Sequence, residues 1–194
     1  MGEIKSAFEK AMEKAAQIEK ATPEELKRME YRPKGNALAA QFLKEDNFDL
    51  EGELNKLKSN RKDVVDGIQE IFLRNILLPK SPIIKRSSGR AMQGIQLIKQ
   101  NKKALTPIFA TLNQLFNYYE QARQQALAQL KQAFEARLAQ ATRQLEQQML
   151  GQKIKIDVER QPEFQQEWLR MQADLDSQYE KVLDEQKKKI EELG

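Results

Sequence analysis

The feature that most constrains the fold is a long stretch without helix breakers in the second half of the chain. Between Pro107 and Gly151 there is neither a glycine nor a proline. Thr106 can cap a helix and Pro107 suits its first turn, so the two together indicate a helix start. Apolar side chains then recur every three or four residues, which places them on one face of a helix. We therefore expect one long helix over residues 105–150.

A second apolar stripe follows over residues 162–193, with the same steps of three and four residues. In both stretches the steps add up to an eleven-residue repeat, about 3.67 residues per turn, which keeps each stripe nearly straight. Two helices with matched stripes and a short connection fold back on each other. The sequence therefore predicts a long antiparallel two-helix coiled-coil arm over residues 105–194, with Phe164 and Trp168 filling its core.

The connection between these two helices, residues 151–161, has a different pattern. Apolar and polar residues alternate from Lys153 to Val158, as in a strand. We expect a short β segment at this tip of the hairpin, and an isolated strand is marginal unless it pairs with a partner. A second copy of the chain would supply that partner, most simply in a dimer. The side chains expected to make this homo-oligomer contact are Ile154, Ile156 and Val158.

The first half of the chain, residues 1–104, predicts a compact helical base. Thr22 and Glu25 have the spacing of a capping box, with a proline in the first turn between them. Pro33 pushes the residue before it out of the helical region, so residues 31–35 are expected to form a connector. Further helices are predicted over residues 3–20, 37–44, 50–58, 60–78 and 89–100, with a loop over residues 80–88.

Residue types that are rare or missing narrow both the fold and the function. With 8 glycines and 6 prolines in 194 residues, the chain has little turn material for a many-stranded sheet, so the predicted class is all-α. The absence of cysteine and histidine excludes disulfides and removes the usual proton shuttle and metal ligand. We expect no enzyme activity, no cofactor, no metal site and no small-molecule substrate. The acidic residues 45–53 are expected to cap helices.

Charge is distributed unevenly along the chain. Residues 71–119 contain 8 basic residues and no acidic one, whereas the segments on either side each carry a small acidic excess. The formal net charge of +4 therefore comes from the middle of the chain. A block of like charge is a candidate surface for an oppositely charged partner.

Within this basic segment, residues 74–103, we expect an anion-binding surface. Its partner is either nucleic acid or an acidic protein. The remaining alternative is a solvated face whose charges are balanced by acids from elsewhere, such as residues 45–53. Charge reversal at Arg86 and Arg90 is expected to leave the fold intact, because a loop contributes little to a core. The candidate site residues are Lys80, Lys85, Arg86, Arg90, Lys99, Lys102 and Lys103.

The sequence also bears on location. No apolar run approaches the roughly 18–20 residues that cross a bilayer. The first twenty residues alternate charged and apolar side chains and lack the apolar centre of a signal peptide. We expect no membrane contact and a cytoplasmic location.

Two stretches resemble a family of uncharacterised bacterial proteins. They are residues 1–9 (Met-Gly-Glu-Ile-Lys-Ser-Ala-Phe-Glu) and the tail from Ile154 to Tyr179, which begins Ile-Lys-Ile-Asp-Val-Glu. The resemblance extends over most of the chain, and it implies neither an activity nor site residues.

These features predict a non-catalytic helical interaction or scaffold protein, which acts through self-association or by docking to a larger assembly. The alternative is a nucleic-acid-associated or ribosome-associated protein that binds through the basic segment.

Overall fold

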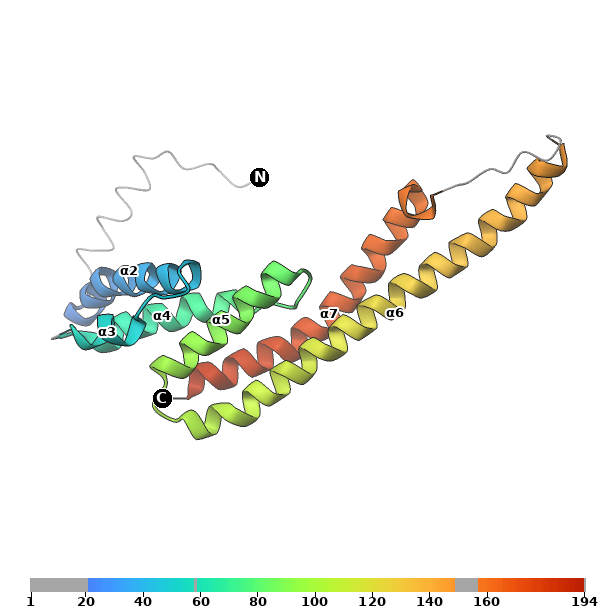
Figure 1. Ribbon diagram of the computed structural model, residues 1–194. Helices are drawn as coiled ribbons and strands as arrows, with labels where there is room; N and C mark the ends of the chain where they lie inside the picture. The colour runs from blue at the N-terminus through green and yellow to red at the C-terminus, as the bar shows by residue number, and fades with distance from the viewer. Residues whose placement is uncertain (1–20, 58, 149–156, 194) are drawn as a thin grey trace, which may run out of the picture. The chain divides into compact units, whose positions relative to one another are not determined.

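The structure of the chain is a computed structural model that describes residues 21–57, 59–148 and 157–193, with the backbone alone for residues 140–148. Within these ranges all regular elements are helical, as predicted, and no strand is present (Figure 1). The helix predicted over residues 3–20 lies outside them. The elements are α2 (Pro23–Lys44), α3 (Leu50–Asn55), α4 (Arg61–Asn75), α5 (Pro82–Ile98), α6 (Lys102–Gln148), the 3-10 helix η1 (Val158–Arg160) and α7 (Pro162–Glu192).

The chain divides into two compact units. The first comprises residues 1–76 and 87–100, and the second comprises residues 77–86 and 101–194. Helix α5 belongs to both, since its first five residues lie in the second unit and the rest in the first. The basic segment is therefore divided between the units.

Helix α2 begins as the sequence predicts. The Thr22 hydroxyl accepts a hydrogen bond from the Glu25 N–H, and the Glu25 carboxylate accepts one from the Thr22 N–H at 2.7 Å, which completes the capping box. The predicted connector over residues 31–35 is wrong, because α2 continues through Pro33 to Lys44. An interior proline costs a helix about 3 kcal/mol. Packing against the rest of the unit offsets that cost.

This packing is a close approach between α2 and α4 at two glycines. A Cβ atom on Gly35 would collide with the carbonyl oxygen of Val64, and a Cβ atom on Gly67 would collide with a carbonyl oxygen of α2. Only glycine lets the two backbones come this near each other. Beside them the rings of Phe42 and Phe72 pack edge to face, with centroids 5.4 Å apart. The packing contact between α2 and α4 thus stabilises α2 around Pro33, where the local sequence predicts an interruption.

Helix α3 is capped from the acidic cluster, as expected. The Asp49 carboxylate accepts a hydrogen bond from the Gly52 N–H at 2.9 Å. Helix α4 follows Asn60, whose φ of 55° lies in the left-handed region that asparagine tolerates. It ends at Asn75, three residues before the predicted end.

The predicted loop over residues 80–88 is wrong. Helix α5 begins at Pro82, and the Ser81 hydroxyl caps it by accepting a hydrogen bond from the Ile84 N–H at 3.3 Å. Serine followed by proline is itself a helix-start pattern. Gly89, from which the predicted helix started, lies inside α5.

Helix α6 begins at Lys102, earlier than the predicted start near Thr106. The Asn101 side chain caps it by accepting a hydrogen bond from the Ala104 N–H at 3.1 Å. Pro107 therefore lies inside the helix, where it has no N–H to donate to the preceding turn. The Thr106 hydroxyl donates to the Lys102 carbonyl at 3.2 Å in that turn. The cap at Asn101, six residues upstream, thus makes Pro107 an interior proline of α6.

Helices α6 and α7 pack side by side in the second unit (Figure 1). The Tyr119 ring contacts the Tyr179 ring, and the Phe134 ring contacts the Phe164 ring, with centroids 5.4 Å apart in both pairs. As residue numbers rise along α6 they fall along α7, so the two helices are antiparallel.

The distal part of this hairpin has a small core of its own. Phe164 is buried there as predicted, whereas Trp168 is only partly buried. Val158 lies in η1, so the described end of the predicted β segment is a 3-10 turn; Ile154 and Ile156 lie outside the described residues. The cluster consists of Leu130, Val158 and Phe164, flanked by Leu127, Phe134, Leu138, Trp168 and Met171.

Candidate functional site: a pocket on the helical hairpin

Residues 77–86, here called the strap, connect α4 to the first turn of α5 and belong to the second unit. Leu78 and Pro79 are buried. At the next residue, the Arg123 guanidinium on α6 donates a hydrogen bond to the Lys80 carbonyl oxygen at 2.8 Å. The backbone of the strap is therefore fixed to α6.

The Lys80 side chain fixes the strap to α7 as well. Its ammonium lies 2.6 Å from one oxygen of Asp176 and 3.6 Å from Glu180. The other Asp176 oxygen accepts a hydrogen bond from the Tyr119 hydroxyl at 2.6 Å. One carboxylate on α7 thus holds both a strap lysine and a tyrosine of α6.

This network changes how its members titrate. The hydrogen bond to Asp176 raises the pKa of the Lys80 ammonium above its ordinary value. Burial, together with the hydrogen bond to Asp176, raises the pKa of the Tyr119 hydroxyl well above its usual range. Lys80 therefore stays charged, and Tyr119 neutral, throughout the physiological pH range.

A second ion pair holds the first turn of α5. The Lys85 ammonium lies 3.0 and 2.8 Å from the two oxygens of Glu120 on α6. Both side chains are partly exposed to solvent, so this pair is weaker and more easily exchanged than a buried one.

Between the strap, α6 and α7 lies a pocket of about 430 Å³. Its apolar wall includes Trp168, and the Arg123 guanidinium lies 5.9 Å from the centroid of the Trp168 ring. The size falls in the range of about 300–1,000 Å³ that is typical of ligand pockets. The lining residues are Pro79, Lys80, Ser81, Pro82, Lys85, Glu120, Arg123, Gln124, Leu127 and Trp168.

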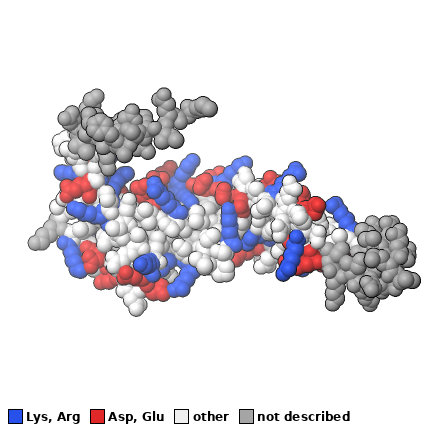
Figure 2. Space-filling view, turned by 90° about the horizontal axis from the view of Figure 1, so that it is seen from above, with Lys and Arg blue, Asp and Glu red and all other residues white. Residues whose placement is uncertain are grey.

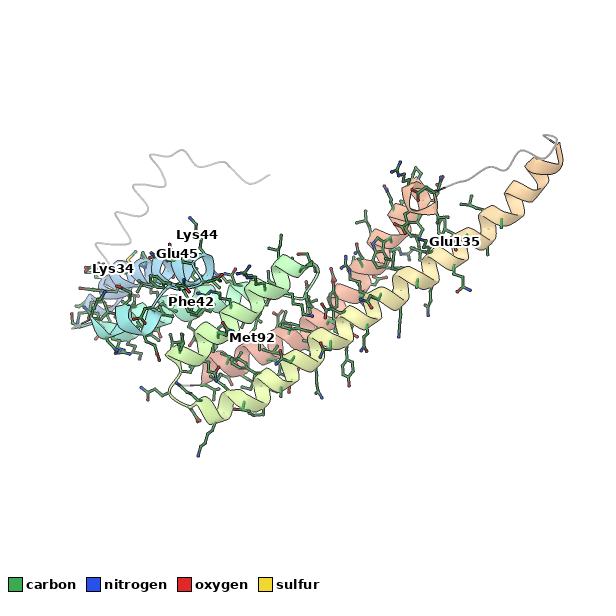
Figure 3. All side chains as sticks on the ribbon, viewed as in Figure 1. Lys34, Phe42, Lys44, Glu45, Met92 and Glu135 are labelled. Atoms are coloured by element: carbon green, nitrogen blue, oxygen red, sulfur yellow. The ribbon has the colours of Figure 1, made fainter. Side chains whose placement is uncertain are left out.

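Arg90, another predicted site residue, has a structural role in the first unit. Its guanidinium donates to the carbonyl oxygens of Phe42 at 2.7 Å and of Asp46 at 3.0 Å, and to that of Glu45. These carbonyls lie at and just beyond the C-terminal end of α2, where helix carbonyls lack partners within the helix. Figure 3 labels Phe42 and Glu45 at this end of the helix. Arg90 therefore lies in a helix and not beside a loop, and we expect its reversal to destabilise the first unit.

The other four predicted cations differ in exposure. Lys99 is buried, with 6 % of its surface exposed. Arg86, Lys102 and Lys103 are exposed. On the face shown in Figure 2, basic and acidic side chains are interspersed. Lys80 and Lys85 thus pair with carboxylates from other parts of the chain, and Arg90 binds backbone carbonyls.

The described residues contain no group of three or more acidic side chains arranged to hold a metal ion. None of the described helices combines the length and apolar character that crossing a bilayer requires.

Sequence reasoning missed the α6 and α7 partners of the basic segment. Glu120 lies 35 residues after its partner Lys85, Asp176 lies further still from Lys80, and nothing in their local sequence marks them. Arg123 carried a signal, because it is the one charged residue that interrupts the apolar stripe of α6. That interruption coincides with its bond to the strap.

The sequence model of a family of unknown function, DUF6657, matches residues 51–192 of this chain. The chain belongs to this family. The match confirms the predicted resemblance to uncharacterised proteins, and it includes both the strap and the hairpin. Neither the curated proteins nor the solved structures contain a significant match to the chain.

Proposed function

We propose that this chain is a non-catalytic interaction protein that docks to a larger assembly through the pocket between the strap and the hairpin. The observation that carries the proposal is a partly exposed tryptophan, Trp168, in the wall of a concave site. Tryptophan is one of the side chains that are enriched among the energetic hot spots of protein interfaces.

The fixed geometry of the site supports docking. Lys80 and Arg123 are each held by a contact to another element, so these walls of the pocket are organised before a partner arrives. Preorganised walls reduce the entropy that binding must overcome.

The alternative, binding of nucleic acid through the basic segment, has weaker support. Asp176, Glu180 and Glu120 lie beside the strap lysines and would repel a run of phosphates. Arg90 binds backbone carbonyls. Exposed Arg86, Lys102 and Lys103 would carry such binding.

The proposal extends to the finer features of the second unit. Helices α6 and α7 pair as a coiled coil with the eleven-residue repeat. Self-association through Ile154 and Ile156 is a second contact, which Val158 does not join because it is buried within the hairpin. The protein acts in the cytoplasm.

The test fills the pocket without disturbing its supports. Gln124 lines the pocket and is exposed, whereas the equally exposed Gln125 does not line it. We expect Gln124→Phe to lower recovery of a specific co-purifying partner from the native source by at least about tenfold. Gln125→Phe, the matched control, leaves recovery unchanged. Equal recovery with both variants would exclude the pocket, and loss of the partner after nuclease treatment would favour the nucleic-acid alternative.

A further inference from the structure

We propose that the ligand of the pocket is an acidic protein segment, which places an apolar side chain against Trp168 and a neighbouring carboxylate near Lys85 and Arg123. This inference rests on the proposed docking function and names the chemistry of the partner.

The charges of the lining residues point to an anionic group. Lys80, Lys85 and Arg123 are cationic, and Glu120 is the lining carboxylate. Lys80 is engaged by Asp176, which is not part of the lining. The positive charge nearest a ligand is therefore that of Lys85 and Arg123.

Lys85 is able to accept a new partner. Two oxygens of Glu120 lie near its ammonium, and an ammonium has three N–H donors. Because the pair is partly exposed, its rearrangement costs little. A ligand carboxylate can join Lys85 or replace Glu120 there.

The apolar part of the ligand is indicated by the apolar residues of the lining. Pro79, Leu127 and Trp168 form an apolar surface that suits an aromatic or branched aliphatic side chain. Next to Pro82, Ile83 is 82 % exposed, the largest value among the exposed large apolar side chains of the described residues. A small molecule inside the pocket would leave Ile83 in water, whereas a peptide long enough to continue from the pocket around α5 would cover it.

A single carboxylate fits this arrangement better than a chain of phosphates. Glu120 in the lining, and Asp176 and Glu180 beside Lys80, would repel a polyanion that runs past the pocket. Binding of RNA is therefore an outcome that would count against the proposal.

The experiment uses the fluorescence of Trp168, the single tryptophan of the chain. The full-length protein is titrated with acetylated pentapeptide amides that have a central phenylalanine and, next to it, one glutamate, one glutamine or one lysine, with alanine at the other positions. We expect the glutamate peptide to bind at least about tenfold more tightly than the lysine peptide at low salt, with the glutamine peptide between them. Binding that is equal for all three, or tightest for the lysine peptide, would overturn the proposal.

The two partners of one ion pair provide the sharper readout. Lys85→Gln should lower the affinity for the glutamate peptide by about threefold, whereas Glu120→Gln should raise that affinity by about threefold. If the pair only supported the strap, both variants would change binding in the same direction. Ile83→Ser should lower the affinity for the peptide but leave the affinity for a free phenylpropionate ion unchanged. Displacement of the peptide by an oligouridylate would assign the pocket to RNA.

The outcomes separate this inference from the proposed function. If no acidic peptide binds while Gln124→Phe still abolishes partner recovery, the ligand chemistry is wrong and the docking function stands. If Gln124→Phe leaves both peptide binding and partner recovery unchanged, both proposals are wrong.

Discussion

The basic segment serves both units, but its cations are used differently in each. In the first unit, Arg90 donates to backbone carbonyls at the end of α2, and the helices beside it touch at glycines. In the second unit, Lys80 and Lys85 pair with carboxylates on partly exposed side chains. A backbone carbonyl is a fixed hydrogen-bond partner, whereas a lysine in an exposed ion pair can exchange its carboxylate for another anion. The first unit should therefore tolerate change poorly, and the second should adjust to a ligand.

The largest effect is expected from Gly67→Ala. Alanine favours a helix over glycine by about 1 kcal/mol, but its Cβ atom would collide with a backbone oxygen of α2. Since a backbone cannot move aside as a side chain does, we expect a net loss of about 2 kcal/mol in the free energy of unfolding. Urea denaturation followed by circular dichroism measures it.

Gly89→Ala is the matched control. A Cβ atom at Gly89 would meet no other atom within 4 Å, so only the helix preference remains. We expect a gain of about 0.5–1 kcal/mol in the free energy of unfolding. A gain with Gly67→Ala as well would show that α2 and α4 are not in close contact there.

The next effect comes from Arg90→Met. This change removes charged hydrogen bonds to carbonyls of α2 and the residues after it, and should cost about 2 kcal/mol in the free energy of unfolding. Arg74→Met removes an exposed ion pair with Glu70 and should cost no more than about 0.5 kcal/mol. Equal costs for the two variants would show that the backbone contacts of Arg90 contribute no more to stability than an exposed ion pair does.

These predictions show where sequence reasoning succeeds. The start of α2 was predicted because Thr22 and Glu25 are neighbours that satisfy each other. The continuation of α2 through Pro33 was not predicted, because the packing contact that supports it comes from Gly67 on another helix. Local patterns reveal caps, while a proline inside a helix depends on packing partners that are distant in sequence.

The same distinction applies to the candidate site. The basic segment is visible as a run of residue types, and Lys80 and Lys85 do line the pocket. Their partners Asp176 and Glu120 lie on a different part of the chain, so no local pattern connects them. Trp168 was placed in the hairpin core because stripe spacing cannot tell a buried position from a partly exposed one at its edge.

A smaller effect is expected at alkaline pH in the second unit. The folded state holds the Tyr119 proton more tightly than the unfolded chain, whose tyrosine ionises near pH 10. The resulting stabilisation is complete below about pH 10 and is lost as the pH rises further. Lys80, whose pKa is also raised, acts in the same direction.

Tyr119→Phe tests this dependence. It should cost about 1 kcal/mol near neutral pH and reduce the fall in stability above pH 10, as measured by Trp168 fluorescence during urea denaturation at pH 8–12. Tyr118→Phe, at the exposed neighbouring residue, should change neither the stability near neutral pH nor the fall in stability above pH 10. If Tyr119→Phe leaves the fall in stability above pH 10 unchanged, the Tyr119 hydroxyl of the original chain is not held by Asp176.

The smallest effect on stability is expected from Lys85→Gln. The exposed pair with Glu120 should contribute no more than about 0.5 kcal/mol to the free energy of unfolding, and less at high salt. A cost above about 1.5 kcal/mol that persists in 1 M salt would show that the second unit is no more adjustable than the first.

The antiparallel pairing of α6 and α7 has a consequence for how the hairpin can vary in length. The polar contact at Tyr119 and the apolar cluster at Leu130 and Phe134 lie along α6 and face the same partner, α7. One inserted residue between them would turn one group by about 100° relative to the other. Substitutions can therefore accumulate one at a time along this hairpin, but its length can change only in steps that restore the helical phase.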